Sequence, residues 1–287
     1  MPSRPNSGPR PLRIESTSRA SSRSPREWKP SVRCRPSETR NCSRSVPEIR
    51  KPNANDPPSM RRPWENDLME RPPAIMCIGR NYLEHARELG NEVDENPIVF
   101  FKNPSALCAS GDDIRLPHIC NHPEPQVDFE GELAVLIGRD ARDVPIENAL
   151  DHVGGYAVAN DVSARWWQKH GSGGQYCRGK SFDTFCPITS FVPANSIPDP
   201  QNLELRTWVN GTLMQSASTS SMMFPVATLI SELSRGMTLL AGTYLLTGTP
   251  AGVGAGRDPK VFLKNGDLIE IEITNVGRLE NRVVAEV

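Results

Sequence analysis

The sequence predicts a β-dominated α/β domain over residues 71–287, preceded by a disordered tail over residues 1–70. Three observations lead to this prediction. Short β-rich runs recur between turn residues (Gly, Pro, Asn and Asp) from residue 75 onward. Apolar residues at helical spacing are rarer in this part of the chain. Residues 1–70 have almost no apolar periodicity, and their prolines break any helix within a few residues.

The β-rich runs are expected to form the strands of the domain. Asn210–Gly211 separates Arg206–Val209 from Thr212–Met214, which is a strong signal for a β-hairpin because both turn residues tolerate positive φ. The expected strands, in chain order, are Ile75–Ile78, Ile98–Phe101, Phe129–Ile137, Gly155–Val158, Leu203–Val209, Tyr244–Thr247, Leu268–Ile273 and Arg282–Val287.

Two helices are expected. The first, Asn81–Leu89, is followed by Gly90, which suits the left-handed position just past a helix C-terminus. The second, Phe224–Leu233, carries apolar residues at helical spacing. No internal repeat is visible, so these elements are expected to share one strand-rich domain.

Residues 1–70 differ in composition from the rest of the chain. They contain 12 Ser, 12 Pro and 15 basic residues against 8 acidic ones, a net charge of +7, whereas residues 71–287 carry −8. Such a polar stretch buries too little apolar surface to offset the entropy of ordering it. We expect a solvated tail, or a segment translated upstream of a true start at Met60 or Met69. An Arg- and Ser-rich organelle-targeting peptide is the alternative.

The composition of the whole chain argues against several classes of protein. A net charge of −1 gives no general attraction to nucleic acid or anionic membrane, and no apolar run approaches the roughly 20 residues that span a bilayer. The seven cysteines are scattered without close pairs, so a disulfide framework or zinc ribbon is not expected. We therefore expect a cytoplasmic protein with no nucleic-acid or membrane partner, organelle targeting being the alternative.

The stretch Val127–Ile137 alternates apolar and acidic residues. Side chains two apart in a strand point to the same face, so Glu130 and Glu132 are expected side by side, next to a buried apolar run. Neighbouring carboxylates repel unless a cation lies between them, and hard divalent cations prefer oxygen ligands. Asp161, at the polar end of the run Gly155–Asp161, supplies a third carboxylate. The alternative is a solvated sheet face with ordinary surface acids.

Other side chains are candidates for catalysis or substrate binding. His85 and Glu88 stand three apart on an expected helix, where the carboxylate can hold the imidazole as a general base, although such a pair is often merely solvated. Lys180, in a Gly-flanked turn, is a candidate to meet an anionic substrate or an oxyanion. Arg165 is a candidate for a two-pronged contact with a substrate carboxylate, its alternative being a surface arginine.

A Gly-rich turn, Thr247–Gly254, begins where the expected strand Tyr244–Thr247 ends. Such a turn can bring backbone amides to an anion, and Thr249 adds a hydroxyl donor, although a plain turn explains the same residues. The turn is not a P-loop, because no Gly-Lys-Ser/Thr follows it, and the chain has no Gly-x-Ser-x-Gly nucleophile elbow.

Six segments are informative when they are taken together: Gly79–Glu88 (GRNYLEHARE), Val127–Gly138 (VDFEGELAVLIG), Ala159–Arg165 (ANDVSAR), Arg178–Pro187 (RGKSFDTFCP), Ser234–Leu240 (SRGMTLL) and Thr247–Gly254 (TGTPAGVG). In this order they resemble the fumarylacetoacetate hydrolase family, specifically its short members built around the C-terminal catalytic domain. The resemblance covers nearly all of residues 75–287, and the tail has no counterpart in it.

This resemblance implies a mixed β-sandwich roll, usually a homodimer, with Mg²⁺ or Mn²⁺ at the mouth of the roll. The family's metal carboxylates match Glu130, Glu132 and Asp161. Its His–Glu pair, on a helix that closes over the substrate, matches His85 and Glu88.

The family's substrate-contacting positions also have counterparts. Two features of the chain are atypical of the family, namely the pair Trp166–Trp167 and the insert Cys120–Gln126, and they leave the size of the substrate open. The matching substrate-contacting residues are Arg165, Gln168, Lys180 and Thr249.

Residues and resemblance together predict a metal-dependent hydrolase that cleaves a carbon–carbon bond in a 1,3-dicarbonyl 2-oxo acid, an acylpyruvate or a fumarylacetoacetate-like compound. In this hypothesis His85, held by Glu88, activates the attacking water, the metal stabilises the enolate, and Lys180 stabilises the attacked oxygen. Without attack by water, the same metal site predicts oxaloacetate decarboxylation or isomerisation of a 2-hydroxymuconate or hydroxyhepta-diene-dioate. A non-catalytic 2-oxo-acid-binding protein is the alternative from another class.

Overall fold

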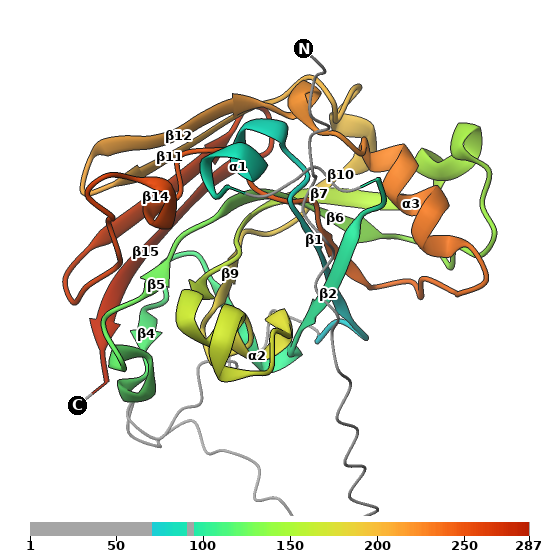
Figure 1. Ribbon diagram of the computed structural model, residues 1–287. Helices are drawn as coiled ribbons and strands as arrows, with labels where there is room; N and C mark the ends of the chain where they lie inside the picture. The colour runs from blue at the N-terminus through green and yellow to red at the C-terminus, as the bar shows by residue number, and fades with distance from the viewer. Residues whose placement is uncertain (1–70, 91–94, 287) are drawn as a thin grey trace, which may run out of the picture. The chain divides into compact units, whose positions relative to one another are not determined.

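The structure, a computed structural model, describes residues 71–90 and 95–286 (Figure 1). Its helices are α1 (Leu83–Glu88), α2 (Tyr176–Gly179) and α3 (Val226–Ser234), and a π-helical turn spans Trp167–Gly171. Its strands are β1 (Ile75–Gly79), β2 (Ile98–Lys102), β3 (Leu107–Ala109), β4 (Ile114–Leu116), β5 (Val127–Asp128), β6 (Gly131–Ile137), β7 (Val153–Asn160), β8 (Ser163–Ala164), β9 (Cys186–Ile188), β10 (Val192–Pro193), β11 (Glu204–Val209), β12 (Thr212–Ser218), β13 (Tyr244–Leu246), β14 (Leu268–Ile273) and β15 (Gly277–Ala285).

Two curled sheets dominate the described part of the chain. The larger runs in the order β2-β1-β13-β6-β7-β9-β3, with β10 paired to β7, and the smaller runs β12-β11-β14-β15-β4. Both are mixed, because β1 pairs parallel with β13 and β15 pairs parallel with β4, whereas β6 and β7 are antiparallel. The predicted strand-rich, mixed roll with few helices is therefore confirmed.

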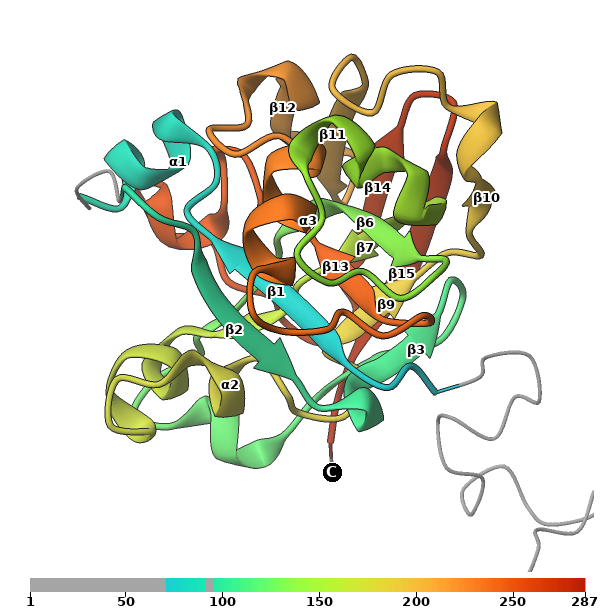
Figure 2. The same cartoon turned by 90° about the vertical axis from the view of Figure 1, so that its right-hand side faces the viewer.

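The core lies between the two sheets. Strand β11 contacts β6, and β14 and β15 contact β7, so the smaller sheet packs on the middle of the larger one (Figure 1). Leu133, Leu205 and Ile271 are completely buried there. Elsewhere α3 lies beside the 3₁₀ segment Ile146–His152 (Figures 1 and 2). The middle strands β6 and β7 thus pack against strands β11, β14 and β15 of the smaller sheet.

The predicted elements are found with shifted ends. Asn210 and Gly211 form the expected hairpin turn, with φ of 52° and 74°. Gly90 takes the expected left-handed conformation, with φ of 68°, and its N–H donates to the Arg87 carbonyl. The first helix begins only at Leu83, because buried Asn81 instead bonds the Phe224 backbone and the Thr247 carbonyl. The last strand begins early, at Gly277, directly after the turn from β14.

The predicted continuous strand Phe129–Ile137 is wrong at its start. Strand β5 ends at Asp128 and pairs with β8, and β6 begins at Gly131. Between them the Phe129 N–H donates to the Asp128 carboxylate and the Glu130 N–H donates to the Asn160 side chain, so side chains replace the ladder partners. Asp128 and Glu130, on either side of this break, both accept hydrogen bonds from Arg165.

The predicted tail, residues 1–70, lies outside the described residues and stays a prediction. Among the described residues, no helix is long and apolar enough to cross a membrane.

Replacing Leu133 tests whether the middle of the larger sheet is the core. Leu133→Ala should lower the free energy of unfolding by about 2–5 kcal/mol, because it leaves a cavity among packed side chains. Urea unfolding followed by circular dichroism measures this. The control is Leu213→Ala, since Leu213 is 49% exposed. Equal losses for the two variants would contradict the assignment of the core.

Candidate active site

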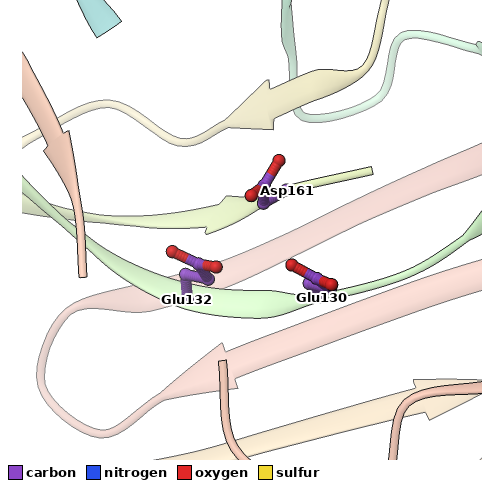
Figure 3. Close-up of side chains that lie close together, drawn as sticks. All are labelled: Glu130, Glu132 and Asp161. Atoms are coloured by element: carbon purple, nitrogen blue, oxygen red, sulfur yellow. The ribbon is translucent and has the colours of Figure 1, made fainter. Parts of the chain in front are cut away.

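The three predicted acidic ligands converge where β6 begins and β7 ends (Figure 3). One carboxylate oxygen from each of Glu130, Glu132 and Asp161 lies within 4.8 Å of the other two. The Asp161 N–H donates to the Glu130 carbonyl, which fixes the end of β7 beside the start of β6. None of the three residues is more than 4% exposed. The acids are therefore a buried cluster rather than a solvated sheet face.

Buried cations pair with two of these carboxylates. The Lys180 ammonium lies 2.6 Å from both Glu130 Oε2 and Asp161 Oδ2. The second oxygen of Asp161 accepts from Lys102 at 2.6 Å, and the second oxygen of Glu130 accepts from Arg165 at 2.5 Å. Both oxygens of Glu130 and Asp161 thus carry charge-assisted hydrogen bonds, which are stronger than neutral ones.

The pKa values of the two glutamates diverge. Burial alone would raise the pKa of Glu130, but the charges of Lys180 and Arg165 outweigh it and hold that pKa well below the usual range. Burial, followed by the charges of Asp161 and Glu130, raises the pKa of Glu132 well above its usual range. Glu132 has no ion pair within the described part of the chain, and it accepts one hydrogen bond from the Gly248 N–H at 2.8 Å.

These residues fit a hard divalent cation. Three carboxylates lie close together, and among the residues that the structure describes Glu132 has no cationic partner of the kind that a buried carboxylate needs. The lysine contacts do not prevent coordination, because each carboxylate oxygen has two lone pairs. Glu130, Glu132 and Asp161 would hold the ion.

The His85–Glu88 pair has the geometry that its spacing predicts. His85 Nδ1 lies 2.8 Å from Glu88 Oε1 on α1, and the other Glu88 oxygen accepts from the Gly252 N–H at 2.9 Å. With Glu88 ionised, the network assigns the ring proton to Nδ1 and leaves the Nε2 lone pair free. His85 is only 5% exposed. It lines a cavity, so Nε2 is the atom available to a bound molecule.

That cavity, of about 360 Å³, joins most of the predicted site. Asp161 and Glu88 are not part of its wall, and they contact residues that are. The predicted residues that line it are His85, Glu130, Glu132, Arg165, Gln168, Lys180 and Thr249.

Arg165 pairs with side chains of its own chain, which the sequence did not indicate. Its two-pronged contact is with Asp128 Oδ2, at 2.9 Å from Nε and 2.7 Å from Nη2. Its Nη1 donates to Glu130 and, at 3.2 Å, to the side chain of Gln168. A contact of Arg165 or Gln168 with substrate stays a prediction.

The Gly-rich turn after β13 brings amides to anions, and these anions are the chain's own carboxylates. The N–H groups of Gly248, Gly252 and Gly254 donate to Glu132, Glu88 and Asp128, respectively, at 2.8–2.9 Å. Thr249 Oγ1 donates to the Gly131 carbonyl and accepts from the side chain of Gln215. The turn therefore organises the site, and the Thr249 hydroxyl already has partners.

Two buried residues of the cluster were missed from the sequence. Lys102 closes the apolar strand β2, and its charge at that end was the available signal. Asp128 is one of the alternating acidic residues of Val127–Ile137, and nothing local indicated its pairing with Arg165.

The two features atypical of the family contact each other. The side-chain oxygen of Gln126, in the insert Cys120–Gln126, accepts from the Trp166 and Trp167 N–H groups. The guanidinium of Arg178 lies over the Trp167 ring, and its Cζ is 4.2 Å from the centroid of that ring. Neither tryptophan lines the cavity, which limits their direct effect on the size of a substrate.

A strand-rich roll with a buried cluster of three carboxylates beside a His–Glu pair defines the class as the fumarylacetoacetate hydrolase superfamily of enzymes. Residues 74–284 match the family model described as fumarylacetoacetate (FAA) hydrolase C-terminal. The chain belongs to this family, as its motifs indicated.

Its relatives include proteins named for a reaction of oxaloacetate. The chain is 46% identical over 216 residues to the oxaloacetate tautomerase FAHD2B, mitochondrial, of Bos taurus, covering 75% of this chain and 67% of that protein. It is 46% identical over 214 residues to the oxaloacetate tautomerase YisK of Bacillus subtilis (strain 168), covering 73% and 69%. The chain thus spans about two thirds of the length of these curated relatives.

Similar proteins whose structures have been solved are named for other activities. One is fumarylpyruvate hydrolase from Pseudomonas aeruginosa in complex with Mn²⁺ and pyruvate, at 32% identity and a TM-score of 0.67, covering 74% of this chain and 90% of that one. Another is 2-hydroxyhepta-2,4-diene-1,7-dioate isomerase from Mycobacterium marinum, at 40% identity and a TM-score of 0.64, covering 75% and 76%. These relatives and solved structures are named for reactions of 2-oxo acids. They match the predicted alternatives, oxaloacetate decarboxylation and isomerisation, better than the predicted hydrolysis, although tautomerisation itself was not predicted.

Replacing Lys102 tests the buried charge cluster. Lys102→Met should lower the free energy of unfolding by about 3 kcal/mol, because it leaves one oxygen of buried Asp161 without a partner. Urea unfolding in the presence of a chelator measures this. The control, Arg235→Met, breaks an exposed pair with Glu232 and should change nothing measurable. Equal effects in both variants would contradict a structural role for Lys102.

Proposed function

We propose that this protein is a divalent-cation-dependent enzyme that interconverts the keto and enol forms of oxaloacetate. One observation carries the proposal: a histidine held by a carboxylate at 2.8 Å lines the same cavity as Glu130 and Glu132. Keto–enol exchange needs one base beside the carbon next to a carbonyl, and it needs no activated water. The names of relatives at 46% identity support oxaloacetate as the substrate.

His85 acts as the base in this proposal. Its Nε2 takes a proton from C3 of the acid, the C3–H electron pair forms the C2=C3 bond, and the carbonyl pair moves to the C2 oxygen, which takes a proton from solvent. His85 then returns the proton it took to solvent, which restores the neutral base. Glu88 stabilises the imidazolium that forms, and the Gly252 N–H keeps Glu88 in place. The Lys180 ammonium, on the wall of the cavity, stabilises negative charge that develops beside it.

Glu130, Glu132 and Asp161 would hold the cation, Mg²⁺ or Mn²⁺. When bound, such an ion supplies a Lewis acid that polarises a carbonyl oxygen and lowers the cost of removing the neighbouring proton.

Hydrolysis of an acylpyruvate-type bond is the second candidate. The specific observation that favours it is the likeness to the fumarylpyruvate hydrolase at 32% identity. In hydrolysis, His85 would take the proton from a water rather than from carbon. Decarboxylation and double-bond isomerisation would use the same cavity.

A panel of substrates separates these reactions. Purified protein with Mg²⁺ or Mn²⁺ is given oxaloacetate, an acylpyruvate, fumarylpyruvate and a hydroxymuconate, and each reaction is repeated with chelator. We expect loss of the ultraviolet absorbance of the oxaloacetate enol without release of CO₂, and no such rate with chelator. Faster acylpyruvate cleavage would overturn the proposal in favour of hydrolysis, and binding without turnover would favour the non-catalytic alternative.

His85→Ala should reduce the rate of keto–enol exchange by about 10²–10⁴-fold, the usual size of a general-base effect. The measurement is kcat for oxaloacetate with Mn²⁺ present. The control is His118→Ala, because His118 is exposed and does not line the cavity. Full activity in His85→Ala would rule out the assigned base.

Glu132→Gln should weaken the binding of Mn²⁺ at least about tenfold, since it replaces a charged oxygen ligand with a neutral one. Electron paramagnetic resonance of free Mn²⁺ measures the affinity without any substrate. Glu147→Gln removes an exposed acid and serves as the control. Unchanged affinity in Glu132→Gln would contradict the metal site.

Assembly and location complete the proposal. The homodimer that the resemblance implies stays a prediction, which analytical ultracentrifugation checks.

The word mitochondrial in the name of the Bos taurus relative supports organelle targeting through residues 1–70 over the cytoplasmic location. Fusing these residues to a fluorescent protein distinguishes the two.

A further inference from the structure

The cavity has a cationic side that the proposed mechanism does not use. Two basic residues, Arg80 and Lys169, line the same cavity as the carboxylates. Arg80 follows β1 just before α1, and Lys169 lies in the π-helical turn Trp167–Gly171. The two residues are distant in sequence, and the fold brings both to one wall.

The charged groups that act on Lys169 are all positive. Within the described part of the chain its ammonium makes no hydrogen bond or ion pair, and the charged groups that act on it are Arg165, Lys260 and Arg80. Partial burial, followed by these like charges, lowers the pKa of Lys169. A positive group so placed is stabilised by an anion from outside the chain.

Arg80 is held in an unusual backbone conformation. Its φ is 56°, in the left-handed region that residues with a Cβ rarely adopt and that persists only where surrounding contacts impose it. Its Nη2 lies 3.4 Å from the hydroxyl of Tyr176, another residue of the cavity wall. The backbone strain and the contact together fix where the Arg80 guanidinium lies.

Arg165 interacts with both the carboxylates and the basic residues of the cavity. It bonds Glu130, and its charge acts on Lys169. The lining therefore includes carboxylates, which would hold a divalent cation, and the basic residues Arg80 and Lys169. A ligand that complements both groups has a chelating group at one end and a negative charge at the other.

We propose that Lys169, with Arg80, binds the second carboxylate of a dicarboxylic 2-oxo acid, and thereby selects such acids over monocarboxylic ones. This inference rests on the proposed function, since it takes the 2-oxo end of the acid to lie at Glu130, Glu132 and Asp161. A lysine and an arginine suit this task because both bind carboxylates through charge-assisted hydrogen bonds.

The test compares oxaloacetate with pyruvate, which has the same 2-oxo acid end and lacks the second carboxylate. Lys169→Met should raise KM for oxaloacetate about tenfold to a hundredfold, the usual range for one hydrogen bond to a charged group, with kcat little changed. Lys169→Glu should raise it further. Arg80→Met should act in the same direction.

Binding is measured separately from turnover. Thermal stabilisation of the Mn²⁺-loaded protein by oxaloacetate should fall in Lys169→Met, whereas stabilisation by pyruvate should be unchanged. The matched control is Lys264→Met, which removes one exposed positive charge away from the cavity and should alter neither. Far-ultraviolet circular dichroism checks that each variant is folded.

The outcomes distinguish this inference from the proposed function. Selective loss of oxaloacetate binding in Lys169→Met supports the carboxylate subsite even if the wild-type protein does not tautomerise oxaloacetate. Equal losses for oxaloacetate and pyruvate, or no loss for either, overturn the subsite even if the tautomerase activity is present. A wild-type protein stabilised by neither acid overturns both.

Discussion

The site depends on the backbone amides of one turn, which hold carboxylates from three different elements. Gly248, Gly252 and Gly254 donate to Glu132 on β6, Glu88 on α1 and Asp128 on β5. Glycine is required in this turn by close approach. A Cβ on Gly252, whose φ is 105°, would lie 2.1 Å from the Met214 carbonyl oxygen, and one on Gly254 would lie 1.7 Å from that of Val261. The same turn therefore aligns the base, the acidic cluster and the partner of Arg165.

Charge compensation is the second constraint on the cavity. A buried carboxylate without a partner is costly, and breaking a buried pair costs several kcal/mol. Asp128, Glu130 and Asp161 each pair with a buried cation, and Glu132 receives an amide. Among the described residues, Glu132 is thus the one acid of these four without a cationic partner, and it is also the one whose pKa is raised, so a bound cation would supply the charge that it lacks.

Much of the site could be predicted because its spacing is local. The two-residue period of a strand placed Glu130 beside Glu132, and the helical interval of three joined His85 to Glu88. The pairing of Lys102 with Asp161, 59 residues apart, depends instead on the order of strands in the larger sheet. The interruption after Asp128 arose from side chains of Asp128 and Asn160 that replaced ladder partners, which alternation of residue types cannot reveal.

The lysine shared by Glu130 and Asp161 also has a consequence for biosynthesis. Because Lys180, Lys102 and Arg165 already neutralise most of the buried acids, the newly made chain can collapse without waiting for an inorganic ion. This differs from small zinc domains, in which the ion itself supplies the folding energy. A divalent ion would then bind to a polypeptide that is already folded, and a molecule without the ion would keep its architecture.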